Sequence, residues 1–135
     1  MFTKEQRSTF PYWFAHWCAF QMTALNFGIW KFRFLFHDWY KPWMKLVCKY
    51  ETVQHYHRYH SRHHLEWGQT HGYEGMDIDA FLVDIECSQY TKQASPLNAV
   101  DKLYDYIAKS NDRDEITFLT YCLNYAELIG MKSRA

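Results

Sequence analysis

WMKLVCKYETVQHYHRYHSRHHLEW, residues 43–67, contains neither glycine nor proline. Its apolar side chains recur at the three- and four-residue spacing of an α-helix, in the set Trp43, Leu46, Val47, Tyr50 and Val53. We therefore predict one long helix from Trp43 to about Trp67.

The residues before this stretch also carry helix signals. Thr3 and Gln6 have the spacing of a capping box, which predicts a first helix over residues 4–26. Gly28 is expected to end it, and residues 29–39 are predicted to form a second helix. His37 and Asp38 would then lie in the last turn of that second helix.

The residues after position 67 also contain signals that begin and end helices. Three glycines within residues 68–75 predict a loop, and Asp77 is a candidate cap for a helix reaching Ser88. Ser95-Pro96 predicts the start of another helix, and Asp112 the start of a last one that ends near Gly130. No strand-like alternation competes, so the expected fold class is all-α: a compact bundle of about five to six helices in a single domain, residues 1–135.

Composition narrows the class of protein. The chain has 135 residues, 48% of them hydrophobic and 22% charged, which is typical of a folded globular domain. Lysine plus arginine equals aspartate plus glutamate at 15 each, so we expect no general nucleic-acid binding. Four scattered cysteines, no signal sequence and no long apolar run predict a soluble cytoplasmic protein with no membrane partner.

Histidine is the residue type with a marked local excess. Six of the eight histidines lie between Gln54 and His71. On a continuous helix His57, His60 and His64 would project from one face, and His60 with His64 would form a two-ligand metal clamp. This pattern favours a metal site over isolated structural histidines.

Carboxylates supply the remaining candidate ligands. His37 and Asp38 are adjacent and are followed by Lys41, while Asp84 stands in an apolar stretch where a buried carboxylate needs a partner. His16 is the remaining candidate. Mixed imidazole and carboxylate donors favour Mn, Fe, Co, Ni or Zn over Mg or Ca, and we expect one or two such divalent ions.

The order His16, His37-Asp38, the histidine cluster and then Asp84 resembles the H…HD…H…H…D arrangement of the HD-domain superfamily of metal-dependent phosphohydrolases. HDWYK, residues 37–41, is similar to its HD-x-x-K element. The segments FLFHDWYK, RYHSRHHLEW and FLVDIECSQYTKQASP also resemble a family of small helical proteins of bacteria and phages. The resemblance spans about residues 14–106.

The resemblance implies an HD-domain-like helical fold that hydrolyses a small phosphorylated substrate, such as a nucleotide. The implied metal ligands are His16, His37, Asp38, His57 or His60, His63, His64 and Asp84. The implied catalytic residues are Asp38, with Lys41 balancing phosphate charge and His60 or His64 protonating the leaving oxygen. Arg58 and Arg62 are the expected substrate-binding residues, because guanidinium groups bind phosphate in a bidentate manner.

Two other functions remain open at this point. A few HD-like folds hold two irons and oxidise their substrates. Alternatively, the metal only joins the helices of a non-catalytic interaction protein, whose aromatic residues, 20% of the chain, bind a partner. His37 at a helix C-terminus would also be favourable without any metal, through the helix dipole.

Overall fold

Helices make up all the regular structure of the described chain. The computed structural model describes residues 1–44, 46–92 and 97–135. Its helices are α1 (Phe10–Asn26), α2 (Lys41–Met44), α3 (Tyr50–His60), α4 (Leu65–His71), α5 (Ile78–Thr91), α6 (Ala99–Lys109) and α7 (Arg113–Leu128), with 3-10 turns η1 (Glu5–Ser8), η2 (Phe32–Phe36) and η3 (Tyr73–Gly75). Within these residues there is no strand, which confirms the predicted all-α class.

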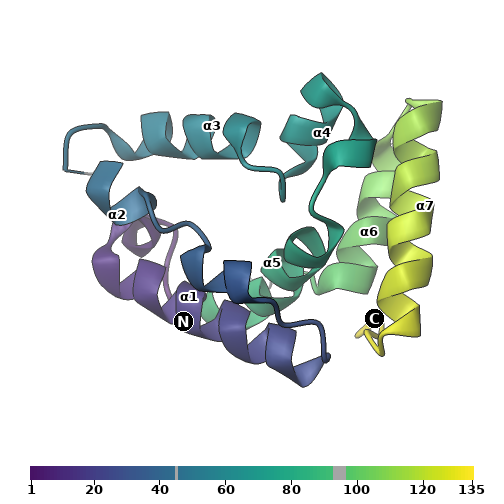
Figure 1. Cartoon of the computed structure of the whole chain (residues 1–135), viewed down its shortest axis with the longest axis horizontal. Coiled ribbons are helices and arrows are strands. Elements are labelled where there is room, and N and C mark those ends of the chain that lie inside the picture. Colours follow the sequence, from purple (N-terminus) through teal and green to yellow (C-terminus); the bar gives the residue numbers. More distant parts are fainter. Residues whose placement is uncertain (45, 93–96) are drawn as a thin grey trace.

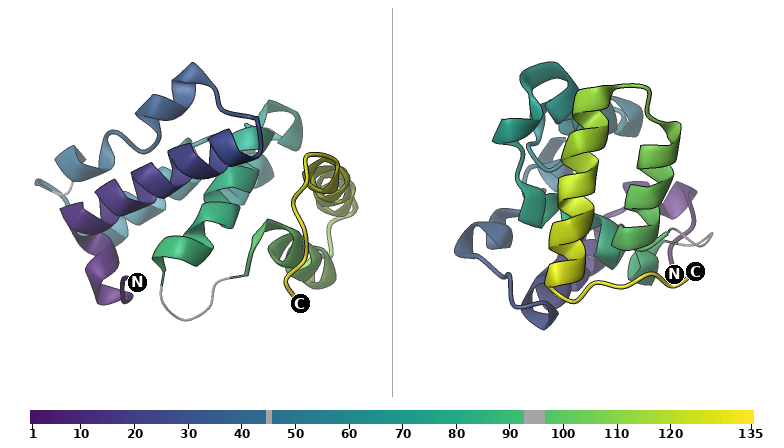
Figure 2. Two further views of the ribbon diagram at one scale, coloured as in Figure 1. Left: turned by 90° about the horizontal axis from the view of Figure 1, so that it is seen from below. Right: turned by 90° about the vertical axis from the view of Figure 1, so that its right-hand side faces the viewer.

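The helices pack in pairs (Figure 1). α1 lies against α5, α6 runs beside α7, and α3 leads into α4 on the opposite side of the molecule from α1. The two turned views show the same arrangement, with the α6–α7 pair at one end (Figure 2). No helix of the described residues is long and apolar enough to cross a membrane.

Two clusters of buried apolar side chains hold these pairs together. The larger cluster joins α4, α5, α6 and α7 through residues such as Leu82, Leu103 and Leu119, which are completely buried. The smaller cluster joins α1 to α5 around Phe20 and Val83. Burial of such side chains is the main favourable term in folding, and here it fixes α1 relative to α5, the two helices that carry His16 and Asp84.

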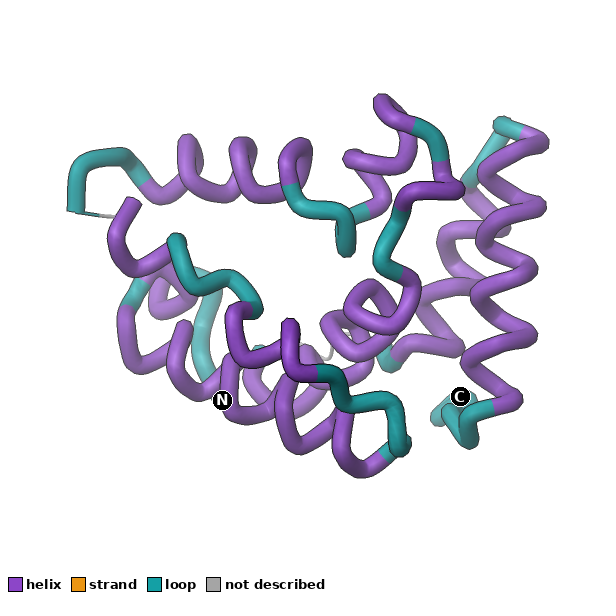
Figure 3. The backbone as a smooth tube through the Cα atoms, in the orientation of Figure 1, coloured by secondary structure: helices purple, strands orange, loops and turns teal. Residues whose placement is uncertain are grey.

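The predicted long helix over residues 43–67 is wrong, since this stretch is divided among α2, α3 and α4 (Figure 3). α3 ends at His60 because Ser61 adopts an extended backbone, with φ −102° and ψ 125°. The Ser61 hydroxyl hydrogen-bonds with the side chains of Tyr40 and His57. These tertiary contacts hold Ser61 in its non-helical conformation, and the break turns His63 and His64 out of the helix.

The predicted loop over residues 68–75 is partly helical, because α4 runs through Gly68. A Cβ atom at Gly68 would lie 2.5 Å from Met76 Sδ and 2.8 Å from Tyr73 Cδ1. This glycine therefore permits close packing of the next turn against α4, and its presence does not signal a loop. The extra breaks in the chain also explain why residues 1–44, 46–92 and 97–135 contain seven α-helices where five or six are expected.

The N-terminal predictions are met only in outline. Thr3 and Gln6 do bond reciprocally, but they close the short η1, and α1 starts at Phe10 with Thr9 as its cap. The predicted helix over residues 29–39 contains only the five-residue η2. This turn ends because His37 leaves the helical conformation, with ψ 120°, and Asp38 follows with a left-handed backbone at φ +54°.

The helices α5, α6 and α7 each begin directly after a residue whose side chain caps the helix. The side chains of Asp77 and Asp112 accept backbone N–H bonds at the starts of α5 and α7, as predicted. The predicted start at Ser95-Pro96 lies outside the described residues, and the described part of α6 begins after Asn98, whose side chain accepts from Asp101 N.

Candidate metal centre

Seven side chains from four parts of the chain converge between α1, α3 and α5. His16 comes from α1, Asp84 from α5, and His37 with Asp38 from the turn between η2 and α2. The other three are His57 in the last turn of α3 and, in the link to α4, His63 and His64. They form two sets, here named the His16 group (His16, His37, Asp38, Asp84) and the His57 group (His57, His63, His64).

The His16 group is held by short contacts to the Asp84 carboxylate. Asp84 Oδ1 lies 2.9 Å from His16 Nε2 and 3.2 Å from His37 Nε2. The ring of His37 stacks on Phe20 with its centroid 3.7 Å away, so the apolar core fixes its orientation. One donor atom from each of the four residues lies within 4.8 Å of the others, which is close enough to surround a metal ion.

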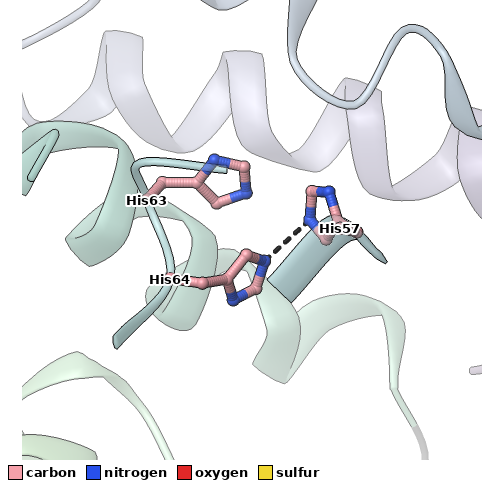
Figure 4. Close-up of side chains that lie close together, drawn as sticks. All are labelled: His57, His63 and His64. Carbon is pink, nitrogen blue, oxygen red and sulfur yellow. Dashed lines mark hydrogen bonds between the residues drawn. The ribbon is translucent and has the colours of Figure 1, made fainter. Parts of the chain in front are cut away.

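The His57 group is formed where α3 ends. The three imidazole rings point toward one another, and Nε2 of His57 lies 2.7 Å from Nε2 of His64 (Figure 4). On its other side, His57 Nδ1 contacts the hydroxyls of Tyr40 and Ser61. If Nδ1 donates its proton to these hydroxyls, Nε2 keeps a free electron pair, which is the tautomer that binds a metal.

Asp38 lies between the two groups. Its Oδ2 is 3.3 Å from His37 Nε2, whereas its Oδ1 is 3.2 Å from His57 Nε2 and 3.5 Å from His63 Nε2. The left-handed backbone of Asp38 and a hydrogen bond from Trp13 Nε1 to its carbonyl hold it there. A carboxylate with one oxygen directed at each ligand set is suited to bridging two cations.

Two buried polar atoms without hydrogen-bond partners indicate whether a cation would fit this site. Asp38 Oδ1 and His63 Nε2 are fully buried, and neither has a hydrogen-bond partner among the described residues. An unsatisfied buried polar group costs about 1–3 kcal/mol, more when it is charged. A divalent ion between these atoms would satisfy both, so the residues present fit a metal.

The ionisation of the site also suits metal binding. Burial lowers the pKa of His57 and of His64, and it lowers the pKa of His63 to about 4. Burial would raise the pKa of the two aspartates, but the pKa of Asp38 is held well below its usual range by His37 and Lys41, and that of Asp84 by His16 and His37. The His57 group is therefore neutral and both carboxylates are charged, the forms that bind metals.

The pKa of His37 shifts in the opposite direction. Burial lowers it, but the Asp38 and Asp84 carboxylates outweigh this effect, and the resulting pKa is raised. A cation bound beside these carboxylates would replace the proton that they otherwise hold on His37.

A cleft of about 480 Å³ opens onto the two groups. Asp84, whose side chain is 17% exposed, and Lys41 reach its wall. The cationic side chains that line the cleft are Lys4, Arg7, Lys41, Arg58 and Lys92. The candidate metal ligands and five cationic side chains therefore border one solvent-accessible space, which favours binding of an anion.

The structure brings together all but two of the residues predicted for the site. His60 is exposed, stacks on Tyr56, and its Nδ1 contacts the Tyr56 carbonyl oxygen. Arg62 donates to the Gly75 carbonyl and lies over Trp67. Both line another hollow, which Asp38 and His63 also border, and neither lines the cleft.

Three of the five cationic residues that line the cleft were not predicted from the sequence, namely Lys4, Arg7 and Lys92. Lys92 had a usable signal, since it follows Asp84 by eight residues and such residues share a helix face. Lys4 and Arg7 had none, because their position depends on the N-terminus pairing with the end of α5, where Phe2 N donates to Thr91 O at 2.8 Å.

The chain matches no protein-family model, and no similar protein was found among curated proteins or among solved structures.

Proposed function

We propose that this protein is an HD-domain-like, metal-dependent phosphohydrolase acting on a small phosphorylated substrate, such as a nucleotide. The observation that carries the proposal is the position of the Asp38 carboxylate. One of its oxygens faces His37, and the other, which has no hydrogen-bond partner among the described residues, faces His57 and His63. This carboxylate borders a cleft lined by cations.

The donor set of imidazoles and carboxylates favours one or two ions of Mn, Fe, Co, Ni or Zn. Bound there, such ions would polarise a phosphoryl oxygen and make water a stronger nucleophile at neutral pH. In the hydrolysis, the water oxygen forms a bond to phosphorus, the bond to the leaving oxygen breaks, and that oxygen gains a proton.

The protein's own groups position the substrate and balance its charge. Lys41 Nζ lies 3.4 Å from Asp38 Oδ2 and borders the cleft, so its ammonium group can neutralise a phosphoryl oxygen beside the ligands. Arg58 borders the same cleft from α3 and offers a bidentate guanidinium to phosphate. Tyr40 and Ser61 hold His57 in one orientation.

The cysteines support a reducing compartment. All four are free thiols, and no pair of them forms a disulfide. Structural disulfides are rare in the cytosol, so we propose that the protein works there.

The test combines metal analysis with a substrate screen. The wild-type protein, an Asp38→Asn variant and a His60→Ala control are purified without chelator and assayed for bound transition metal. Each is then tested for phosphate release from phosphomonoesters and nucleotides in Mn, Co, Ni and Mg. We expect metal and activity in the wild type and in His60→Ala, and loss of both in Asp38→Asn.

The other functions predict different results. A protein with near-stoichiometric iron that consumes oxygen but releases no phosphate would be an oxygenase. A protein that unfolds on chelation and turns over no substrate would use the metal only for structure. Phosphate release that is equal in Asp38→Asn and the wild type would contradict the proposal.

A further inference from the structure

The cleft does not end at the candidate ligands. It adjoins a second cavity of about 420 Å³, and the two share six lining residues: Arg7, Arg58, His64, Glu66, Asp84 and Lys92. The second cavity continues to Lys102 and Tyr106 on α6. A ligand that reaches Asp84 therefore has space to extend along Arg58 and Lys92, away from Asp38.

Positive charge is concentrated along this path. Lysine and arginine together equal aspartate and glutamate over the whole chain, at 15 each. The described residues that line the two cavities nevertheless include six cations, namely Lys4, Arg7, Lys41, Arg58, Lys92 and Lys102. Apart from the candidate ligands Asp38 and Asp84, the carboxylates in these linings are those of Glu51 and Glu66.

The cations differ in how they are neutralised. Lys41 lies beside Asp38, and Lys102 Nζ lies 4.0 Å from Asp105. Arg58 and Lys92, in contrast, have no ion-pair partner among the described residues. Both border the two cavities, so an anion bound there would meet two cations that no carboxylate of the described residues neutralises.

One phosphate group cannot use all of this charge. A phosphate monoester carries about −1.5 to −2 at neutral pH, and beside the candidate ligands it already meets Lys41. Arg58 and Lys92 border both cavities, so they can reach a further phosphate farther along the path.

We propose that the substrate carries at least two phosphate groups, as in a nucleoside di- or triphosphate, and that Arg58 and Lys92 bind the phosphate beyond the one placed at the metal ligands. This inference rests on the proposed function, because that function identifies which end of the path holds the reacting phosphate.

The test measures binding of probes that contain no hydrolysable P–O–P bond. Methylenediphosphonate and methylphosphonate are titrated calorimetrically into the protein as purified, with its metal content recorded. We expect the diphosphonate to bind at least ~10-fold more tightly than the monophosphonate, since a further set of charge-assisted hydrogen bonds is worth that factor. Lys92→Gln should remove most of this difference and leave methylphosphonate binding within about twofold. Arg58→Gln should also remove most of the difference, because it should weaken binding of the diphosphonate more than binding of methylphosphonate.

Controls separate charge from folding. Lys109→Gln removes an exposed lysine that pairs with Asp105 outside the two cavities, and it should change neither affinity. Lys92→Arg should retain the preference for the diphosphonate. If Lys92→Gln lowers the melting temperature, Arg58→Gln decides the question, because Arg58 is an exposed residue.

Equal affinity for the two probes, or a preference that survives both glutamine variants, would overturn the inference. Either result can occur while the wild type still releases phosphate from a monoester, and the proposed function would then stand without it. Conversely, a preference for the diphosphonate that depends on Arg58 and Lys92, in a protein without hydrolase activity, would contradict the proposed function alone.

Discussion

The Nε2 atoms of His57 and His64 lie 2.7 Å apart, with their rings at 80° to each other. Burial lowers the pKa of both rings, so neither is cationic near neutral pH. Two free electron pairs at this distance repel, and a proton or a cation has to lie between the nitrogens. The arrangement suits a metal ion that both rings bind.

Transition metal is therefore expected to stabilise the folded protein. At a free metal concentration 100 times the dissociation constant, the gain in the free energy of unfolding is about 2.7 kcal/mol. Thermal unfolding with and without Zn or Mn measures it. His64→Ala should lose the metal-dependent rise in melting temperature and His60→Ala should keep it, while an equal rise in both would show that the His57 group binds no metal.

Tyr40 is expected to tune metal affinity without touching the metal. Its hydroxyl contacts His57 Nδ1 and lies 2.9 Å from Ser61 Oγ, and burial raises its pKa to about 12, so it stays protonated. Tyr40→Phe should weaken metal binding by about 10–100-fold, the usual effect of losing such a hydrogen bond. Competition with a fluorescent chelator measures this, with Tyr56→Phe, a neighbouring ring, as the control. Equal affinities in the two variants would contradict the role given to Tyr40.

The pH dependence of the metal-free protein has a definite sign. The pKa values of His57, His63 and His64 are lowered on folding, that of His63 to about 4 from an ordinary value near 6.5. Between these pH values the unfolded chain binds more protons, so stability falls as the pH falls, by up to about 1.4 kcal/mol per pH unit for each histidine. His37, with its raised pKa, has the opposite effect, but only above about pH 5.5, where the unfolded chain begins to lose its proton.

Urea unfolding in the presence of a chelator, at several pH values from 4.5 to 6.5, would measure this slope. The His63→Gln variant removes one of the three histidines and should show a shallower slope. A slope that is absent, or that has the opposite sign, would mean that these rings are solvated in the metal-free protein.

Asp38 is both a candidate metal ligand and a residue with a left-handed backbone conformation. Its φ of +54° is tolerated by aspartate and asparagine better than by alanine. Asp38→Asn and Asp38→Ala should both lose metal, but the metal-free alanine variant should be less stable than the asparagine variant by about 1 kcal/mol. Urea unfolding of both variants checks this, and equal stabilities would show that the left-handed backbone carries no cost.

The sequence predicted most of the site and less of the helices that build it. Asp84 was found as a carboxylate in an apolar stretch and His37 with Asp38 as an adjacent pair, while His16 was added from the residue order of the HD-domain resemblance. The break at Ser61 was missed because residues 43–67 contain no glycine or proline, and the Ser61 backbone depends on contacts with Tyr40 and His57 that only the folded chain supplies. The same break explains why His60 and His64 do not form a pair on one helix, and why Arg62 does not line the cleft.

The cleft was the least predictable part. Its cations lie at η1, at the start of α2, on α3 and just after α5. The two N-terminal cations reach it because Phe2 N donates to Thr91 O. Hydrophobic periodicity describes one helix at a time and carries no information about such pairing.

The α6–α7 pair supplies no residue to either ligand group, although it provides Leu103, Leu119 and Cys122 to the larger apolar cluster. The candidate metal ligands thus come from the first 84 residues, and the residues after them contribute mainly to the apolar core. Substitutions on the outer faces of α6 and α7 can accumulate without touching a candidate ligand. A tag or a fused domain is best attached after Ala135, because Met131 is buried in the larger apolar cluster and Ser133 and Arg134 bond to Asp101.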